Sequence, residues 1–568
     1  MLPVNIDNLS SYLKPPDGYR FQKGLTTTYS LHLDTLLTIP MFLDGTLAEE
    51  NAVIQNYASV VSTINKFRDS FKVYVQKGEI KTSSLGSKKA SKLYELLRGV
   101  IEELPRDTKV KSFHPKLWIL QYGNDINYKY KLIILSKNLT NSQDLDIAVV
   151  FDGMEVKKSI HHNINESLMS FVNNISENHM FMKNELKNIE WQNIDGYQLK
   201  NFYILPEDSR KLPFFDGSKI DKKSIVFSPF ISDDIFEVEN ENILVTREDE
   251  INKQICEEIY TINSSLENNQ EVDEIVDSSL FDNDKKFNNR ISINQLHAKI
   301  YISEPETLIF GSANATNRGF RANNEILIEL EAPSDFYSDV KKYIKDDKNK
   351  LFVKLQKEYA TVEEKESKLV DELFDNNKRI IVNGSITVKY ENKKLILKSS
   401  FVFDESVKIE VTPVSKNSFK IYQDCLVWEN LKNIDITGWF RFKLTVESES
   451  REFLMSDEEF QLNKQYLKSI EEEANDKSDR YLEAHLISLL SDGRITSFEH
   501  RNTIKKDKDE DMYNYCSKQE RNEDNLYDLL LDRFSSSKYH YNQALSIMKK
   551  LNKDGYKELL EILPKATL

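Results

Sequence analysis

Cysteine is almost absent from this chain, and its scarcity excludes proteins built around disulfides or zinc clusters. Only 3 cysteines occur among 568 residues, at Cys256, Cys425 and Cys516. Because they are odd in number and far apart, they predict neither a disulfide framework nor a metal cluster. Few thiols suit a reducing compartment, so we expect a cytoplasmic protein.

Long apolar runs and an excess of positive charge are also missing. No run is long enough to cross a bilayer, and residues 1–14 lack the basic and then apolar pattern of a signal peptide. We therefore expect no membrane partner. The formal net charge is -15, which gives no overall attraction to nucleic acid or to an anionic membrane. A phosphate-rich substrate must therefore be held by a local basic patch.

A basic stretch between residues 66 and 98 is the candidate for such a patch. Either its side chains bind phosphates, or they form an ordinary solvated surface around a loop at residues 83–87. The basic residues are Lys66, Arg68, Lys72, Lys77, Lys81, Lys88, Lys89, Lys92 and Arg98.

The chain has enough apolar residues for several domains. Hydrophobic residues make up 39% of the sequence, more than a disordered chain carries. The length exceeds what a single core supports, so we expect more than one domain.

Two short patterns in the sequence mirror each other. Residues 114–116 are His-Pro-Lys and residues 136–138 are Ser-Lys-Asn; residues 297–299 are His-Ala-Lys and residues 312–314 are Ser-Ala-Asn. A duplicated set of His, Lys and Asn suits metal-free phosphodiester chemistry. One histidine attacks phosphorus and the other protonates the leaving oxygen, while lysines and asparagines stabilise the charge on the phosphate oxygens.

The mirror extends to the flanking segments, which indicates an internal duplication of about domain size. Apolar runs around each motif predict strands, and a polar helical stretch closes each half. Alternating strands and helices predict an α/β layered fold. The corresponding segments are 26–30 and 225–231, 116–121 and 299–303, 128–136 and 307–312, 147–151 and 326–330, and the helical 157–189 and 336–357.

The character of the sequence changes after about residue 366. Residues 379–453 alternate apolar and polar side chains between turn signals, which predicts a small antiparallel β domain of the sandwich type. From residue 457 to the end, apolar residues recur at helical spacing, with a charged connector at 505–511. We expect a C-terminal helical domain there.

The two motif copies resemble the phospholipase D superfamily. Its usual pattern is His-x-Lys, four residues, Asp, six residues and Gly-Ser-x-Asn. The second copy fits closely, with Glu304 at the Asp position and Gly311 at the Gly position. The first copy has Gln121 and Leu135 instead, and is more similar to tyrosyl-DNA phosphodiesterases, which lack that acid but keep a downstream Asn. The resemblance covers about residues 20–350.

This resemblance implies a duplicated phospholipase D-like α/β/α sandwich. Its two halves would pack around a pseudo-twofold axis, so that both His-x-Lys segments meet at one phosphate. The expected domains are the two halves at 1–190 and 191–366, the β-sandwich-like domain at 367–456 and the helical domain at 457–568.

The resemblance also implies roles for the motif residues. One histidine is the nucleophile and the other the general acid; we expect His114 to be the nucleophile and His297 the acid, because the N-terminal copy holds that role in several relatives. The phosphate oxygens would then be bound by Lys116, Lys299, Asn138 and Asn314.

An acid after each Asn would orient a histidine and raise its basicity, as Asp does in a catalytic triad. Glu325 lies just before the strand at 326–330, and Asp146 lies just before the strand at 147–151. Asp144 is the alternative to Asp146. Both acids also fit a plainer interpretation, as exposed carboxylates at the start of a strand.

Four further residues near the motifs are candidates for substrate contact. Ser136 and Ser312 either donate hydrogen bonds to the phosphate or serve as turn residues. Arg318 and Arg321 either grip neighbouring phosphates through bidentate contacts or cap a loop. No group of residues has metal-ligand spacing, and the predicted chemistry needs no metal or other cofactor.

The substrate is not determined by the fold, and three functions remain open. The favoured one is a metal-independent DNA endonuclease that forms a phosphohistidine, with RNA as a further substrate, in a restriction or phage-defence system. The second is a lipid enzyme such as a phospholipase or cardiolipin synthase, although the sequence shows no amphipathic anchor. The third is a non-catalytic nucleic-acid-binding scaffold, against which the intact His and Lys pairs argue.

The C-terminal domains suggest partners by analogy with related systems. They suit docking to an ATPase or helicase. Because both motif copies lie on one chain, the site needs no dimer, and we expect a monomer or a homodimer.

Overall fold

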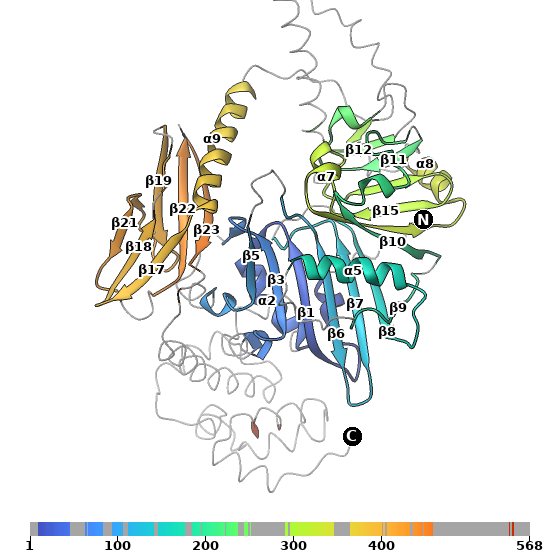
Figure 1. The fold of residues 1–568 in the computed structure, drawn as a ribbon, viewed down its shortest axis with the longest axis horizontal. Coiled ribbons are helices and arrows are strands. Elements are labelled where there is room, and N and C mark those ends of the chain that lie inside the picture. Colours follow the sequence, from blue (N-terminus) through green and yellow to red (C-terminus); the bar gives the residue numbers. More distant parts are fainter. Residues whose placement is uncertain are drawn as a thin grey trace, which may run out of the picture. The chain divides into compact units, whose positions relative to one another are not determined.

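The computed structural model describes two large β-sheets, a further β domain and their helices (Figure 1). By contacts, the chain divides into two units, residues 1–48 with 63–462 and residues 49–62 with 463–568. The predicted helical domain at 457–568 and the loop at 83–87 lie almost wholly outside the described residues. These are 9–45, 63–64, 66–82, 94–105, 112–140, 146–175, 185–194, 196–221, 223–236, 243–247, 250, 290–292, 296–345, 364–399, 401–403, 406–431, 436–446, 448–457, 460, 545 and 548–549.

The first sheet has seven strands in the order β5-β3-β1-β6-β7-β8-β9. Strands β1, β3 and β5 are parallel, and from β1 to β9 each neighbouring pair is antiparallel. Strand β6 is buried throughout, as its apolar run requires. The bounds are β1 (Arg20–Thr28), β3 (Phe71–Gln76), β5 (Ile101–Leu104), β6 (Leu117–Gly123), β7 (Tyr128–Leu135), β8 (Ala148–Glu155) and β9 (Ile189–Trp191).

The second sheet has the order β10-β16-β15-β14-β11-β12-β13 and repeats the topology of the first except at one edge, where β10 comes before β11 in the chain whereas β9 follows β8. Strands β11, β12 and β13 are parallel, and β11, β14, β15, β16 and β10 pair antiparallel in turn. The duplication read from the sequence is thus present in the sheet order. The bounds are β10 (Gln198–Leu205), β11 (Ser224–Phe227), β12 (Ile243–Thr246), β13 (Arg290–Ser292), β14 (Ile300–Ser303), β15 (Thr307–Gly311) and β16 (Glu325–Glu331).

One apolar core joins the two sheets. It contains residues of both, such as Ile119 and Ile300, and helix α5 contacts β10 of the other sheet, with the rings of Phe171 and Phe202 6.3 Å apart. The mixed α/β class is therefore confirmed. The helices are α1 (Leu9–Leu13), α2 (Leu33–Leu43), α5 (His162–Ile175), α7 (Asn317–Arg321) and α8 (Phe336–Lys345), with short 3-10 turns η2 (Ser209–Lys211) and η3 (Asp233–Ile235).

The helix predicted at 157–189 is met by α5 over His162–Ile175, and residues 176–184 lie outside the described part of the chain. Ile189 belongs to β9 instead, where it pairs with Glu155 of β8. The prediction of a helix at 336–357 is met as far as Lys345, and residues 346–357 lie outside the described part of the chain.

Helix α9 (Glu364–Asn383) and two sheets form the accessory β domain, whose residues from Glu364 on are drawn yellow to orange in Figure 1. The β structure predicted from residue 379 starts only at Ile386, because α9 buries Val370, Phe374 and Ile381 against the domain core. One sheet contains β17 (Ile386–Glu391), β18 (Lys394–Ser399) and β21 (Cys425–Trp428). The other has the order β2-β4-β23-β22-β19-β20, with β2 (Leu31–His32), β4 (Ile80–Lys81), β23 (Glu449–Ser456), β22 (Trp439–Val446), β19 (Val407–Pro413) and β20 (Lys420–Ile421).

The six-stranded sheet takes two of its strands, β2 and β4, from the first half of the chain. Buried polar contacts strengthen this junction. The carboxylate of Glu95 accepts hydrogen bonds from the Thr437 hydroxyl and from the Gly438 N–H at 2.9 Å. Arg98 donates to the backbone carbonyls of Phe460, at 2.6 Å, and Asp457. The accessory domain is therefore built onto the first half rather than tethered to it.

These contacts bear on the predicted basic patch. Arg98 is engaged at the domain junction, Lys72 donates to the Gly99 carbonyl at 2.7 Å, and Lys66 pairs with Asp44. Lys88, Lys89 and Lys92 lie outside the described residues. Among the described helices, none is both long and apolar enough to cross a bilayer.

Candidate active site

Both His-x-Lys segments lie just before a strand, whereas we expected Lys116 and Lys299 to begin one. His114 and Lys116 precede β6, and His297 and Lys299 precede β14. The two segments are held alike: the Lys116 carbonyl accepts from the Leu135 N–H at 3.0 Å, and the Lys299 carbonyl accepts from the Gly311 N–H at 3.3 Å. The motifs therefore occupy equivalent places in the two sheets.

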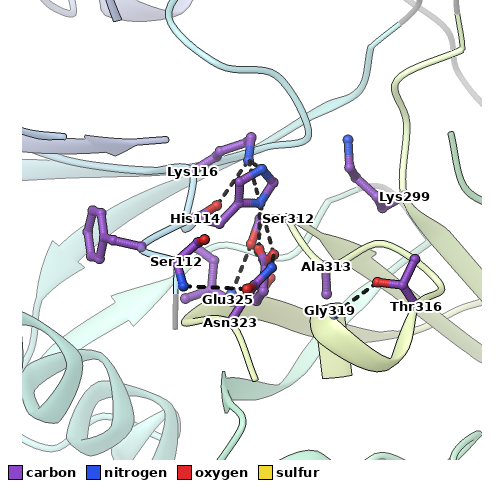
Figure 2. A network of polar contacts seen from close by, with 12 residues as sticks. Ser112, His114, Lys116, Lys299, Ser312, Ala313, Thr316, Gly319, Asn323 and Glu325 are labelled. Carbon is purple, nitrogen blue, oxygen red and sulfur yellow. Dashed lines mark hydrogen bonds and ion pairs between the residues drawn. The ribbon is translucent and has the colours of Figure 1, made fainter. Parts of the chain in front are cut away.

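His114 contacts a carboxylate from the other half. Its Nδ1 lies 2.9 Å from a carboxylate oxygen of Glu325, whose side chain is fully buried at the start of β16. The Lys116 ammonium lies 3.0 Å from Nδ1 and 3.2 Å from Nε2 of the same ring. Figure 2 shows His114 between Lys116 and Glu325, with Lys299 of the second half beside them.

His297, in the second half, likewise contacts a carboxylate from the first half. Its Nδ1 lies 3.3 Å from Asp146, which precedes β8 in the first half. The Lys299 ammonium lies 3.0 Å from the same Nδ1 and donates to the Ser136 carbonyl at 3.3 Å. Each histidine thus takes its carboxylate from the opposite half, and neither pair is complete in one half alone.

A backbone bridge holds the halves together beside His114. The His114 N–H donates to the Asn324 carbonyl at 2.9 Å, and the Asn324 N–H donates to the Ser112 carbonyl at 2.9 Å. The Asn323 side chain accepts from the Ser112 N–H at 3.4 Å and lies 3.5 Å from Glu325 (Figure 2). Because these bonds flank both members of the pair, they fix His114 against Glu325.

Asn138 and Asn314 follow equivalent strands and share one unusual feature. The side-chain Oδ1 of each is buried with no hydrogen-bond partner among the described residues. A buried polar atom without a partner needs an explanation, such as a ligand. An amide here can accept a hydrogen bond from a ligand or, turned about its last torsion, donate one to a phosphate oxygen.

Equivalent hydroxyls hold the two asparagine loops. Thr28, at the end of β1, accepts from the Leu139 N–H at 3.1 Å, and Ser228, just after β11, accepts from the Ala315 N–H at 2.9 Å. Each hydroxyl also donates to a carbonyl two residues further along its own chain. The residue after each Asn is thus fixed in the same way in both halves.

The hydroxyls of Ser136 and Ser312 are occupied within the protein. Both are buried and accept from the N–H of the facing strand, Ile147 at 3.1 Å and Ile326 at 3.0 Å. Ser136 also donates to Asp146 at 2.7 Å, so it orients the acid that faces His297. A contact of either serine with substrate stays a prediction.

Gly311 of the second motif is required by the backbone. A Cβ at this position would lie 2.2 Å from the Ile326 carbonyl oxygen, closer than atoms approach. The first copy has Leu135 instead, at the end of β7. The family's acid positions lie elsewhere: Glu304 is exposed in the turn between β14 and β15, and Gln121 is buried against Tyr130 and Glu185.

Arg318 and Arg321 lie on α7, which begins three residues after Asn314, and both are exposed. Arg321 donates to the Ser218 carbonyl at 2.9 Å, and its guanidinium lies 5.8 Å from the Phe215 ring. Phosphate binding by the two arginines therefore stays a prediction.

Burial dominates the electrostatics of the site. It lowers the pKa of His114 to about 4; Glu325 opposes this shift and Lys116 adds to it. Burial also lowers the pKa of Lys116 to about 8, against Glu325 and Asp146. The pKa of His297 is lowered by burial, while Asp146 raises it. Both rings are therefore neutral at pH 7 in the free protein, and a bound phosphate anion would favour protonation of either one.

Tyr29 is a site residue that sequence reasoning missed. Its ring centroid lies 5.0 Å from that of His114. The sequence signal was its place directly after β1, in a segment already matched with residues 225–231. Within the described part of the chain, no three His, Cys, Asp or Glu side chains are grouped so as to hold a metal.

Residues 260–348 match the family model described as "Cardiolipin synthase, PLD-like domain". The chain thus carries a phospholipase D-like domain, and the predicted membership of the phospholipase D superfamily is confirmed. No curated protein matches the sequence.

Three solved structures show the range of similarity. A mutant of yeast tyrosyl-DNA phosphodiesterase has 10% identity, over 57% of this chain and 84% of that chain, with a TM-score of 0.36. Phosphatidylserine synthase of Haemophilus influenzae has 10% identity, over 64% and 90%, with a TM-score of 0.32. NucT from Helicobacter pylori has 11% identity, over 28% and 99%, with a TM-score of 0.17. Similarity of this degree does not assign a substrate.

Proposed function

We propose that this protein is a metal-independent phosphodiesterase that cuts DNA as an endonuclease, on a duplicated phospholipase D-like α/β/α sandwich. The observation that carries the proposal is the crossed pair of histidines, each 2.9–3.3 Å from a carboxylate of the other half and each beside a lysine. Phosphohistidine chemistry uses two imidazoles and two ammonium groups, and it needs no metal.

In the proposed first step, neutral His114 keeps its proton on Nδ1, facing Glu325, so that Nε2 carries the lone pair that attacks phosphorus. The N–P bond forms as the P–O bond breaks, and His297 gives its proton to the leaving oxygen. Glu325 stabilises the imidazolium that results. Lys116 and Lys299 neutralise the phosphate oxygens.

In the second step, water attacks the phosphohistidine. His297, now neutral, takes the proton of that water, and the N–P bond breaks to release the product phosphate and neutral His114. If an alcohol took the place of water, the same steps would transfer the phosphoryl group and the protein would be a transferase. We therefore propose water as the acceptor.

The contrast between the two pairs supports His114 as the nucleophile. Glu325 is fully buried and lies 2.9 Å from its histidine, whereas Asp146 is partly exposed, lies 3.3 Å away and also accepts from Ser136. A short hydrogen bond that is shielded from water favours one histidine tautomer more strongly than a longer, partly solvated one does. The firmly held ring suits the atom that must form a bond to phosphorus.

The choice of DNA follows the likeness of the first motif to tyrosyl-DNA phosphodiesterases, with RNA as a further substrate. On analogy, we place the activity in restriction or phage defence. The accessory and C-terminal parts would then dock an ATPase or helicase, and the chain would act as a monomer or homodimer. A second candidate, phospholipid phosphodiester chemistry, is favoured by the description of the matching family model.

Cleavage of labelled single- and double-stranded DNA in excess EDTA tests the proposal. The wild type should cut, and His114→Ala and His297→Ala should not; His162→Ala, an exposed histidine on α5, is the matched control. With a nitrophenyl leaving group, which needs no proton, His297→Ala should accumulate an acid-labile adduct and His114→Ala should not. Cutting that needs a divalent metal would refute the mechanism. Turnover of phospholipid vesicles without DNA cutting would favour the second candidate.

A further inference from the structure

Tyr29 packs its ring against the histidine that we assign as nucleophile. The two ring centroids are 5.0 Å apart and the planes are inclined by 53°. Glu325 and Lys116 contact the ring nitrogens of His114, whereas the aromatic ring of Tyr29 packs against the imidazole ring. A tilted contact of this kind restricts rotation of the imidazole.

The position of Tyr29 is itself set by a buried acid. The Tyr29 hydroxyl donates to Oε1 of Glu79 at 3.0 Å. The same oxygen accepts from the Lys378 ammonium at 2.6 Å, and the side chains of Glu79 and Lys378 are only 11% and 24% exposed. Because the pair is largely shielded from water, it is stronger than a surface ion pair.

Lys378 belongs to the accessory β domain. It lies on α9, and its ammonium is 5.5 Å from the ring of Phe453 on β23. A chain of side-chain contacts therefore leads from α9 through Glu79 and Tyr29 to His114.

A backbone route runs in parallel. In the accessory sheet, Leu454 of β23 pairs with Ile80 of β4, and Ile80 pairs with Leu31 of β2. Leu31 in turn bridges to Leu139, and the His32 N–H donates to the Leu139 carbonyl at 2.8 Å. Leu139 directly follows Asn138, which we predict to bind phosphate. The edge strand β2 of the accessory sheet therefore contacts the loop that carries Asn138.

The second half differs at the equivalent point. Thr28 and Ser228 make the same hydrogen bonds, so the residue that corresponds to Tyr29 is Pro229. Proline has neither an aromatic ring nor a hydroxyl. The duplication therefore places this contact at His114 and not at His297.

We propose that Tyr29 is a positioning residue for His114, and that Glu79 and Lys378 hold it in place, so that the accessory β domain sets the geometry of the nucleophile. The kinetic part of this inference rests on the proposed phosphodiesterase function. The part that concerns the His114 ring does not.

The kinetic test uses the full chain and bis(p-nitrophenyl) phosphate, which reports phosphodiester cleavage whatever the natural substrate. Tyr29→Phe keeps the ring and removes its anchor, and Lys378→Met removes the ion pair. Each should lower kcat by about 3- to 10-fold, the value of one hydrogen bond, with KM within about twofold. Lys394→Met, which breaks an exposed ion pair of the same domain, is the matched control and should leave kcat unchanged.

The double variant Tyr29→Phe/Lys378→Met decides whether the residues act in series. If they do, it loses no more than the worse single variant, because both changes break the same connection. Losses that multiply, or single variants that leave kcat unchanged, overturn the proposal.

Histidine NMR supplies a readout that needs no turnover. The His114 signal is identified by its loss in His114→Gln. Burial is the largest cause of its low pKa, with Glu325, Lys116 and Lys299 as the charges that face it. Tyr29→Ala should admit water and raise the pKa from about 4 towards 6.5, while Tyr29→Phe leaves it in place. An unchanged pKa in Tyr29→Ala overturns the proposal. If the wild type cleaves nothing but this shift appears, the proposed function fails and the positioning role stands.

Discussion

Replacing Glu325 by Gln removes the charge that faces His114 and keeps the size of the side chain. The carboxylate is fully buried and lies 2.9 Å from Nδ1. A charge-assisted hydrogen bond contributes about 1.5 kcal/mol at the low end, and two charges about 4 Å apart interact by about 4 kcal/mol at an effective dielectric constant of 20. Because the imidazolium forms only during reaction, kcat should fall by about 10- to 1,000-fold.

The measurement is single-turnover cleavage of a nitrophenyl phosphodiester by wild type and Glu325→Gln in EDTA. Formation of the covalent adduct should slow, since Glu325 supports the attacking histidine. Glu331→Gln is the control: it lies on the same strand, is 40% exposed and pairs with Lys200, so its rate should match the wild type. The histidine signal adds a second check, because loss of the carboxylate should lower the pKa of His114 below about 4.

Because Glu325 faces His114 and Asp146 faces His297, replacing Asp146 should affect the other chemical step. Asp146→Asn perturbs His297, so it should slow substrates with poor leaving groups and spare adduct formation from nitrophenyl esters. If Glu325→Gln keeps kcat within about twofold, or slows only leaving-group protonation, then the assignment of His114 as nucleophile is wrong.

Three further predictions follow from the geometry. The kcat/KM profile should peak below pH 6.5, because His114 stays neutral down to about pH 4 while His297, whose pKa is lowered from 6.5, must be protonated to act as acid; a maximum above pH 8 would contradict this. Gly311→Ala should lower the free energy of unfolding in urea by about 1–3 kcal/mol, because its Cβ meets the Ile326 carbonyl, and no loss would contradict that contact. Arg98→Met should lower protection of β22 and β23 in hydrogen exchange by about 3–5 kcal/mol, because Glu95 loses its buried partner; Arg451→Met, an exposed pair, should not.

Many of the strands and the internal duplication could be predicted from the sequence, because both produce local patterns of apolar and polar residues. Runs such as Leu117–Gly123 are mostly apolar on both faces and too short for a typical buried helix, which favours a buried strand. The repeated His, Lys, Ser and Asn revealed the duplication without any knowledge of which strands pair. The expectation of strands from residue 379 was wrong for residues 379–383, because the apolar positions Val370, Phe374 and Ile381 belong to helix α9, which runs to Asn383.

The candidate site divides in the same way. The sequence by itself determined which residue types would meet, since the two motifs and the acids Asp146 and Glu325 precede matching strands. Only the tertiary structure decided that each acid serves the histidine of the other half, that β2 and β4 join the accessory sheet, and that Tyr29 covers His114. The physical reason is that side-chain periodicity reports the burial of one segment, whereas contacts between residues far apart in the sequence depend on how whole sheets pack.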